Sequence, residues 1–186
     1  MSCLLAALLL AHPNQDEKDV DRAIEAFQKE WSTHRANPAG RRNSIAALRS
    51  FQSDKIVDVL VAKVDREGEV EVLEELLREI GHYGKNETAV TCLFDQLPKY
   101  MKKPTLLQVC FEGLGSADSR LTRPRVKMVN EWVGHKDLYV AVPAIRALGR
   151  IRHKSSFPDL IKRLRKAQQD MRDYIAKTNP KGCDGQ

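Results

Sequence analysis

The sequence predicts an all-α fold in which about four helical hairpins stack into a right-handed α-solenoid behind an N-terminal capping helix. Three observations support this prediction. Leu, Ala, Glu, Lys and Arg dominate the composition, and apolar residues recur at helical spacing. A two-helix unit also returns along the chain at intervals of 29, 34 and 37 residues. A single hairpin cannot bury both of its apolar faces, so the unit has to be repeated to form a continuous core.

The unit is clearest in residues 142–164, VPAIRALGRIRHKSSFPDLIKRL, where two apolar-striped segments flank a short basic turn. Each copy has an anchor residue that ends its first helix and is followed by a turn and a second helix. The four anchors are Leu48, Leu77, Phe111 and Leu148. Residues 45–48 also align without a gap on residues 145–148, which indicates that the first and last copies are related.

Four segments match the i, i+3, i+4, i+7 spacing of one helix face. They are Leu73, Leu76, Leu77 and Ile80; Val90, Leu93, Phe94 and Leu97; Leu107, Cys110, Phe111 and Leu114; and Phe157, Leu160, Ile161 and Leu164. The same spacing occurs upstream of the repeats in Val20, Ala23, Ile24, Phe27 and Trp31. Acidic residues begin this upstream segment and basic residues end it, which suits the helix dipole and predicts the capping helix.

The expected helices are 17–34, 39–51, 54–65, 70–82, 86–101, 104–115, 124–133, 138–152 and 155–176. A longer connection, 116–124, stretches the third copy. Pro143 is expected to kink the first helix of the last copy or to make it start late. Residues 16–176 are therefore expected to form one domain, followed by a flexible tail over 177–186.

The stretch AIRALGRIRHKSSFPDLIKRL resembles the HEAT-like repeat family, in particular the short bacterial repeats first noted in phycobilisome lyases. Repeats of that family carry an Ala-rich first helix ending in Leu-Gly-x-Ile, then a turn, then a helix with a Leu-Ile pair. The resemblance is good over 141–164, fair over 41–64 and 70–97, and poor over 104–133. It implies the solenoid fold and protein binding along a concave surface, and it implies no particular activity.

The N-terminus carries an apolar run, Leu4–Ala11, of the length of a signal-peptide core, and the small Ala11 suits the position before a cleavage site. No Lys or Arg precedes the run, and Leu9 is bulky for the −3 position. We interpret residues 1–15 as a signal peptide or leader, which favours a periplasmic or secreted protein, with a cytoplasmic protein as the alternative. The run is shorter than the ~20 residues of a membrane-spanning helix.

No pattern in the sequence predicts a catalytic residue, a cofactor or a metal. The cysteines Cys3, Cys92, Cys110 and Cys183 form no C-x-x-C pair, and we expect Cys92 and Cys110 to be buried on neighbouring helices. None of the histidines precedes a glutamate, as the HEAT-type metal hydroxylases require. His82 and His153 share a repeat position but are interpreted as turn residues.

Two further residue groups are interpreted as structural. The acidic run Glu67, Glu69, Glu71, Glu74, Glu75 and Glu79 lacks the spacing of a calcium loop and is expected to form a solvated face. The two tryptophans, Trp31 and Trp132, lie on or beside apolar stripes and are expected to pack in the core.

The charge is distributed unevenly along the chain. Residues 1–118 hold 15 basic and 19 acidic residues, whereas residues 119–186 hold 16 basic and 6 acidic ones. Because the HEAT-like resemblance implies protein binding, we expect a non-catalytic protein-interaction scaffold, and the charge asymmetry favours an acidic partner protein, with nucleic-acid binding as the alternative. The concave wall is expected from segments 54–65, 86–101, 124–133 and 155–170. The candidate partner-binding residues are Arg150, Lys162, Arg163 and Lys166.

Overall fold

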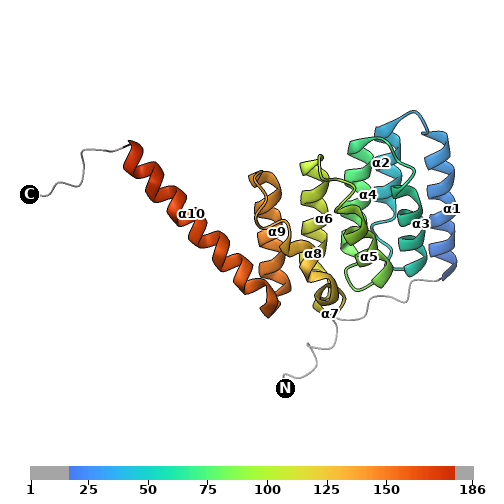
Figure 1. Cartoon of the computed structure of the whole chain (residues 1–186). Helices are drawn as coiled ribbons and strands as arrows, with labels where there is room; N and C mark the ends of the chain where they lie inside the picture. Colours follow the sequence, from blue (N-terminus) through green and yellow to red (C-terminus); the bar gives the residue numbers. More distant parts are fainter. Residues whose placement is uncertain (1–16, 179–186) are drawn as a thin grey trace, which may run out of the picture.

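Helices make up all the regular structure of residues 17–178, the part of the chain that the computed structural model describes (Figure 1). In chain order they are α1 (Glu17–Thr33), α2 (Pro38–Ala47), α3 (Asp54–Val64), α4 (Val70–His82), α5 (Glu87–Gln96), α6 (Pro104–Ser116), α7 (Ser119–Thr122), the 3-10 turn η1 (Arg123–Arg125), α8 (Val126–Asn130), α9 (Leu138–Ile151), the 3-10 turn η2 (Lys154–Ser156) and α10 (Phe157–Thr178). The all-α prediction is confirmed.

The longer helices pack side by side in a regular order. Helices α2, α4, α6 and α9 form a row in which each contacts the next, and the α4–α6 and α6–α9 contacts are the most extensive. Helix α1 covers α2 and α3 at one end of this row. Helix α3 packs against α4 and α5, and α5 packs against α6, so these second helices lie beside the row (Figure 1).

Local sequence signals explain where several helices start. The side chains of Asn37, Asn86 and Asp137 accept hydrogen bonds from backbone N–H groups of α2, α5 and α9, which satisfies donors that the first helical turn leaves free. Pro38 and Pro104 stand in the first turns of α2 and α6, where a missing N–H costs nothing. At its other end α9 stops at Arg152, which has a left-handed φ of 53°.

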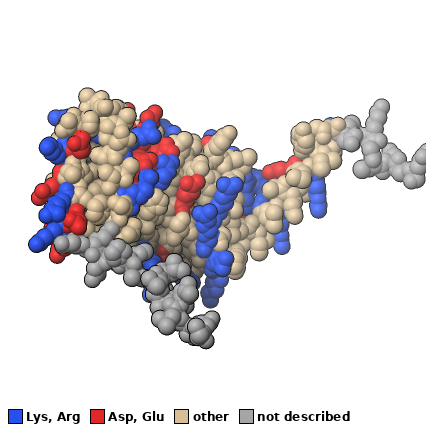
Figure 2. Space-filling view, turned by 180° about the vertical axis from the view of Figure 1, so that it is seen from behind, with Lys and Arg blue, Asp and Glu red and all other residues tan. Residues whose placement is uncertain are grey.

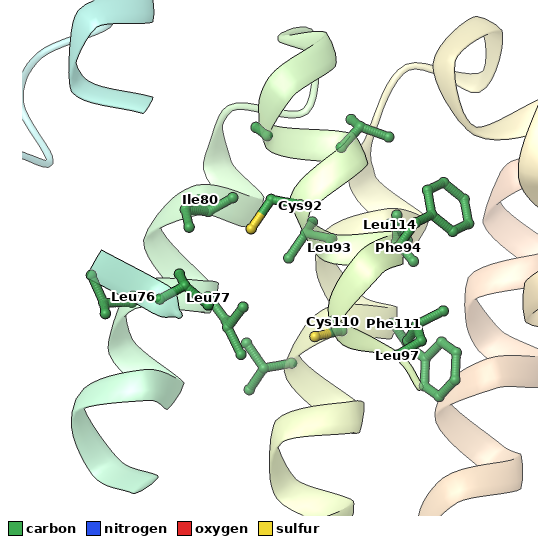
Figure 3. Packing of buried hydrophobic residues seen from close by; sticks show 14 of the residues in the cluster. Leu76, Leu77, Ile80, Cys92, Leu93, Phe94, Leu97, Cys110, Phe111 and Leu114 are labelled. Atoms are coloured by element: carbon green, nitrogen blue, oxygen red, sulfur yellow. The ribbon is translucent and has the colours of Figure 1, made fainter. Parts of the chain in front are cut away.

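The core is built from the predicted stripes of the middle helices. Figure 3 shows side chains of α4, α5 and α6 meeting in one apolar layer. The twelve stripe residues of these three helices and of the C-cap of α5 are each at most 2% exposed. They are Leu73, Leu76, Leu77, Ile80, Val90, Leu93, Phe94, Leu97, Leu107, Cys110, Phe111 and Leu114. The helical periodicity therefore identified the buried faces correctly.

Glycines let the row of helices approach closely. A Cβ atom at Gly113 of α6 would lie 2.8 Å from Cδ1 of Leu93 and 3.1 Å from the Cα of Gly81 on α4.

Gly113→Val should therefore lower the free energy of unfolding by about 1–3 kcal/mol, because added atoms force apart a close-packed contact. Urea unfolding followed by circular dichroism measures this loss. Gly68→Val, at a position with open space around it, is the control, and equal losses in both variants would contradict the close-packing argument.

Some predicted boundaries were wrong. Helices α2 and α5 end earlier than expected, at Ala47 and Gln96, and turns follow. The expected helix 124–133 is divided into η1 and α8, and part of the expected connection forms α7. Helix α9 starts at Leu138 and continues through Pro143, so the expected late start is wrong. Pro143 is buried there, within a helix that packs extensively on α6.

The last helix departs most from the prediction. Helix α10 projects away from the packed helices (Figure 1), and none of its residues is buried. Of its expected stripe, only Leu160 packs against the core, while Phe157, Ile161 and Leu164 are 55%, 49% and 59% exposed. Segment 155–170 therefore does not line up with α3 and α5 as a continuous wall. The physical reason is that no described helix follows α10, whereas α4 and α6 cover α3 and α5.

The expected leader, residues 1–15, and all but the first two residues of the expected tail lie outside the described residues. Helix α10 itself continues to Thr178, two residues beyond the expected end of the domain.

Candidate functional site

The acidic run is engaged by basic residues of the preceding hairpin. Arg41 Nη1 lies 2.6 Å from Glu67 Oε2, and Arg42 Nη1 lies 3.2 Å from Glu71 Oε2. The interpretation of the run as a solvated face is wrong for Glu67, whose side chain is 2% exposed. Its partner is 26 residues away in the sequence, so the sequence pattern alone did not reveal the pair.

The same contact between α2 and α4 buries a second carboxylate. Arg49 donates from Nε to Glu79 Oε2 at 2.9 Å and from Nη2 to Glu75 Oε1 at 2.6 Å. The Glu79 side chain is fully buried, and its Oε1 has no hydrogen-bond partner. The hydrogen bonds to Glu79 and then Glu75 raise the pKa of Arg49. These cations therefore serve the packing of one hairpin on the next.

The basic residues of the C-terminal helices differ in this respect. The arginines of α2 and α4 (Arg41, Arg42 and Arg78), together with Arg49 in the turn after α2, all form ion pairs within the described chain. The basic residues of 146–166 form none with any described residue: Arg146, Arg150, Arg152, Lys154, Lys162, Arg163, Arg165 and Lys166. Figure 2 shows blue and red interleaved over the end that carries α1 and basic side chains gathered towards α10. Their charge is therefore available to a partner.

The structure brings three of the four candidate residues together. Lys162, Arg163 and Lys166 line a pocket of about 360 Å³ where α10 leaves the body. The opposite wall comes from Asn130, Glu131, Val133 and Gly134, at and after the end of α8, and Asp159 also contributes, so two carboxylates line the pocket with the three cations. Arg150 does not line this pocket. It lies on α9 beside α6, where its Cδ would be 3.3 Å from a Cβ atom at Gly115.

One lining residue was not singled out from the sequence. Asn130 ends α8, and its Oδ1 is buried without a hydrogen-bond partner. A carboxamide oxygen of this kind accepts a hydrogen bond from a donor such as a lysine or a partner's N–H group. A single asparagine at the end of a short helix gives no sequence signal that would have marked it.

A second pocket, of about 550 Å³, lies among the turns that join successive helices. Its polar groups bind one another: Asn86 donates to Asp54 at 2.6 Å, and the backbone N–H of Asp118 donates to the Gly84 carbonyl at 2.8 Å. Hydrogen bonds from Arg120 lower the pKa of Asp118 to about 2. These contacts hold successive turns together.

The histidines of residues 17–178 have local partners. His82 is the last residue of α4 rather than a turn residue, and its Nδ1 lies 3.5 Å from Glu79 Oε2. His153 caps η2 and accepts a hydrogen bond from the backbone N–H of Ser155. Within residues 17–178, no three His, Cys, Asp or Glu side chains are grouped so that they could hold a metal ion.

The tryptophans pack against the core, as expected, but both are only partly buried. The ring centroid of Trp31 lies 5.3 Å from that of Phe27, and the Nζ of Lys63 lies 5.5 Å from the Trp31 centroid. Trp132 meets Phe111 edge to face at 6.1 Å between centroids. Each ring therefore closes an edge of the core.

Cys92 and Cys110 are buried free thiols, which confirms the expectation. Burial raises the pKa of Cys92 to about 11 and raises that of Cys110 as well.

At pH 8, Cys92 should react with iodoacetamide at least roughly 100-fold more slowly in the folded protein than in urea, because its thiolate fraction falls by more than that factor. Peptide mapping by mass spectrometry measures both rates, and rapid native labelling of Cys92 would contradict the buried setting.

Comparison of the chain with protein-family models, with curated proteins and with solved structures finds no match. Among the described helices, none has both the length and the apolar character that crossing a membrane requires. The geometry of the chain's own residues is therefore the basis for the function proposed below.

Proposed function

We propose that the protein is a non-catalytic protein-interaction scaffold, built as a right-handed α-solenoid of about four HEAT-like hairpins with α1 as its cap. The row α2–α4–α6–α9 supports the repeat arrangement, because each hairpin's first helix contacts that of the next. The surface formed by Lys162, Arg163 and Lys166 is the proposed binding site for an acidic partner protein. We refer to these three residues as the basic surface.

The observation that carries this proposal is that the basic residues of 146–166 have no ion-pair partner among the described residues, whereas Arg41, Arg42, Arg49 and Arg78 are paired. A charge that is already paired inside the chain contributes little to the binding of a partner, because an oppositely charged side chain already neutralises it. The basic surface has no such counterion among the described residues. Arg163 adds a planar guanidinium that binds a carboxylate through two hydrogen bonds at once.

Charge reversal of the basic surface tests the proposal. The triple variant Lys162→Glu, Arg163→Glu, Lys166→Glu should lose at least about tenfold in recovery of bound partner proteins, because every proposed contact becomes repulsive. Nuclease-treated extracts of cells that express the protein natively provide the partners, and quantitative mass spectrometry measures recovery with wild-type and variant full chains.

The matched control changes the net charge equally at a distance from the basic surface. It is the triple variant Lys29→Glu, Lys85→Glu, Lys102→Glu, whose three side chains are exposed. The control should keep the wild-type partners. If reversal of the basic surface left every partner at wild-type recovery, the surface would serve solubility alone and the proposal would be wrong.

Nucleic-acid binding is the second candidate, and the same unpaired cations favour it. Phosphate groups need only positive charge, and such binding weakens steeply as salt increases. Titration of the full chain with a fluorescent DNA duplex at two salt concentrations separates the candidates. Tight, strongly salt-dependent binding that the basic-surface reversal abolishes would favour this second function, whereas weak binding of wild type and reversal variant alike would count against it.

A further inference from the structure

The two ends of the helix row are built differently. At the N-terminal end, no large apolar side chain of α1 is exposed, since Val20 and Phe27 are buried and Ile24 and Trp31 pack against the core. At the C-terminal end, the exposed large apolar side chains of α9 and α10 are Leu138, Tyr139, Val142, Phe157, Ile161, Leu164, Met171, Tyr174 and Ile175. Stacked helical arrays need polar outer faces at both ends to remain soluble. Within residues 17–178, only the α1 end has a polar outer face.

The outer face of α9 repeats the features of the contacts inside the row. A Cβ atom at Gly81 would lie 3.1 Å from the Gly113 Cα, and one at Gly115 would lie 3.1 Å from the Ala147 Cα, so neighbouring helices meet at glycine. A Cβ atom at Gly149 of α9 would meet no atom of another described helix within 4 Å. Gly149 follows the exposed Leu138 and Val142 at the spacing of one helix face, and Ile145 on the same face is partly buried against the core. The N-terminal half of α9 therefore presents an apolar stripe of the kind that the row buries elsewhere.

Helix α10 carries a second uncovered stripe. Phe157, Ile161, Leu164, Met171 and Ile175 recur at i, i+4, i+7, i+14 and i+18, which places them on one face of the helix. All five are between 49% and 65% exposed. Inside the row, the corresponding second helices α3 and α5 are covered by α4 and α6. Among the described helices, none covers the exposed stripe of α9 or that of α10.

Charge decides which helix fits. Residues 138–168 hold eight basic residues and one acidic residue, Asp159. A second copy that docked through the same end would bring two such positive surfaces together, which costs free energy. A helix with acidic side chains beside its apolar stripe would instead pair with the exposed Arg146 and Arg165, which border the two stripes.

We propose that α9 and α10 together bind an amphipathic helix of a partner protein, whose apolar stripe is flanked by acidic side chains and continues the helix row. We refer to this site as the open end. The proposal rests on the protein-binding function proposed above and adds to it the form of the partner: a helix laid against the apolar stripes, with Arg146 at the edge of the α9 stripe and Arg165 at the edge of the α10 stripe. Lys162, Arg163 and Lys166 lie on the opposite face of α10.

The test uses a synthetic fluorescent helical peptide about as long as α10, with leucine and alanine on one face and glutamate on the flanks. A twin peptide has lysine in place of every glutamate. Fluorescence anisotropy with the full chain should show the glutamate peptide binding at least about tenfold more tightly than its twin. The variant Leu164→Asp should weaken the glutamate peptide at least about tenfold, since it places a charge within the apolar contact.

Met101→Asp is the matched control, because Met101 is 58% exposed and Leu164 is 59% exposed. It should leave binding unchanged. Equal binding of the two peptides, no binding of either, or no effect of Leu164→Asp would overturn the proposal. So would sedimentation showing that the full chain self-associates and that Leu164→Asp makes it monomeric, because a second copy would then occupy the open end.

The outcome for the open end is separable from that for the scaffold function. If natural partners depend on the basic surface but are unaffected by Leu164→Asp, the inference about the open end fails and the scaffold function stands. If reversal of the basic surface also leaves all partners unchanged, both proposals fail.

Discussion

Phe111→Ala is expected to lower the free energy of unfolding by about 3–5 kcal/mol, the range for loss of a large aromatic side chain from a packed core. Phe111 is fully buried on α6, between the α4–α5 hairpin and the hairpins that follow (Figure 3). Its ring also meets Trp132 edge to face. Truncation removes this contact and leaves a cavity at the centre of the row, where surrounding helices are held on both sides and relax little.

Urea unfolding measured by circular dichroism gives the loss for Phe111→Ala. The control is Phe157→Ala, the same chemical change at a side chain that is 55% exposed on α10. It should change the free energy of unfolding by less than about 0.5 kcal/mol. If the two variants lost equal amounts, the distinction between a packed row and an uncovered α10 would be wrong.

Arg49→Ala is expected to lower the free energy of unfolding by about 2–4 kcal/mol, because it leaves the buried carboxylate of Glu79 without its cation. The estimate is below the full range for buried pairs because the Arg49 side chain is 47% exposed. Arg42→Ala is the matched control. Its partner Glu71 is 73% exposed, so its loss should be under about 1 kcal/mol.

A second substitution tests the cause of the Arg49 effect. In the double variant Arg49→Ala, Glu79→Gln, the buried group is a neutral amide, so part of the lost stability should return. Denaturant midpoints of the four proteins complete a double-mutant cycle. A double variant less stable than Arg49→Ala would show that the charge of Glu79 is not what makes the single change costly.

The sequence allowed accurate prediction where one helix face is set by local spacing. The stripes of α4, α5 and α6 were predicted residue by residue, because residues three and four apart share a face whatever the tertiary structure. The grouping of Lys162, Arg163 and Lys166 was predictable for the same reason, since one turn of α10 carries all three.

Features that depend on distant parts of the chain were not predictable. The partners of Glu67 and Glu79 lie 26 and 30 residues away, so an acidic run that reads as a solvated surface is partly buried in ion pairs. A stripe such as that of α10 shows that a face is apolar but not whether anything covers it. Arg150 was grouped with Lys162, Arg163 and Lys166 because it is close to them in the sequence. In the structure Arg150 lies on α9 beside α6, whereas the other three line a pocket on α10.

Hydrogen exchange of the full chain, alone and bound to a natural partner recovered by the basic surface, tests the scaffold account most directly. The account predicts added protection in backbone amides of α9 and α10, residues 138–178, and unchanged exchange in α1 to α3. Protection confined to α1 to α3, with α9 and α10 exchanging as in the free protein, would contradict it.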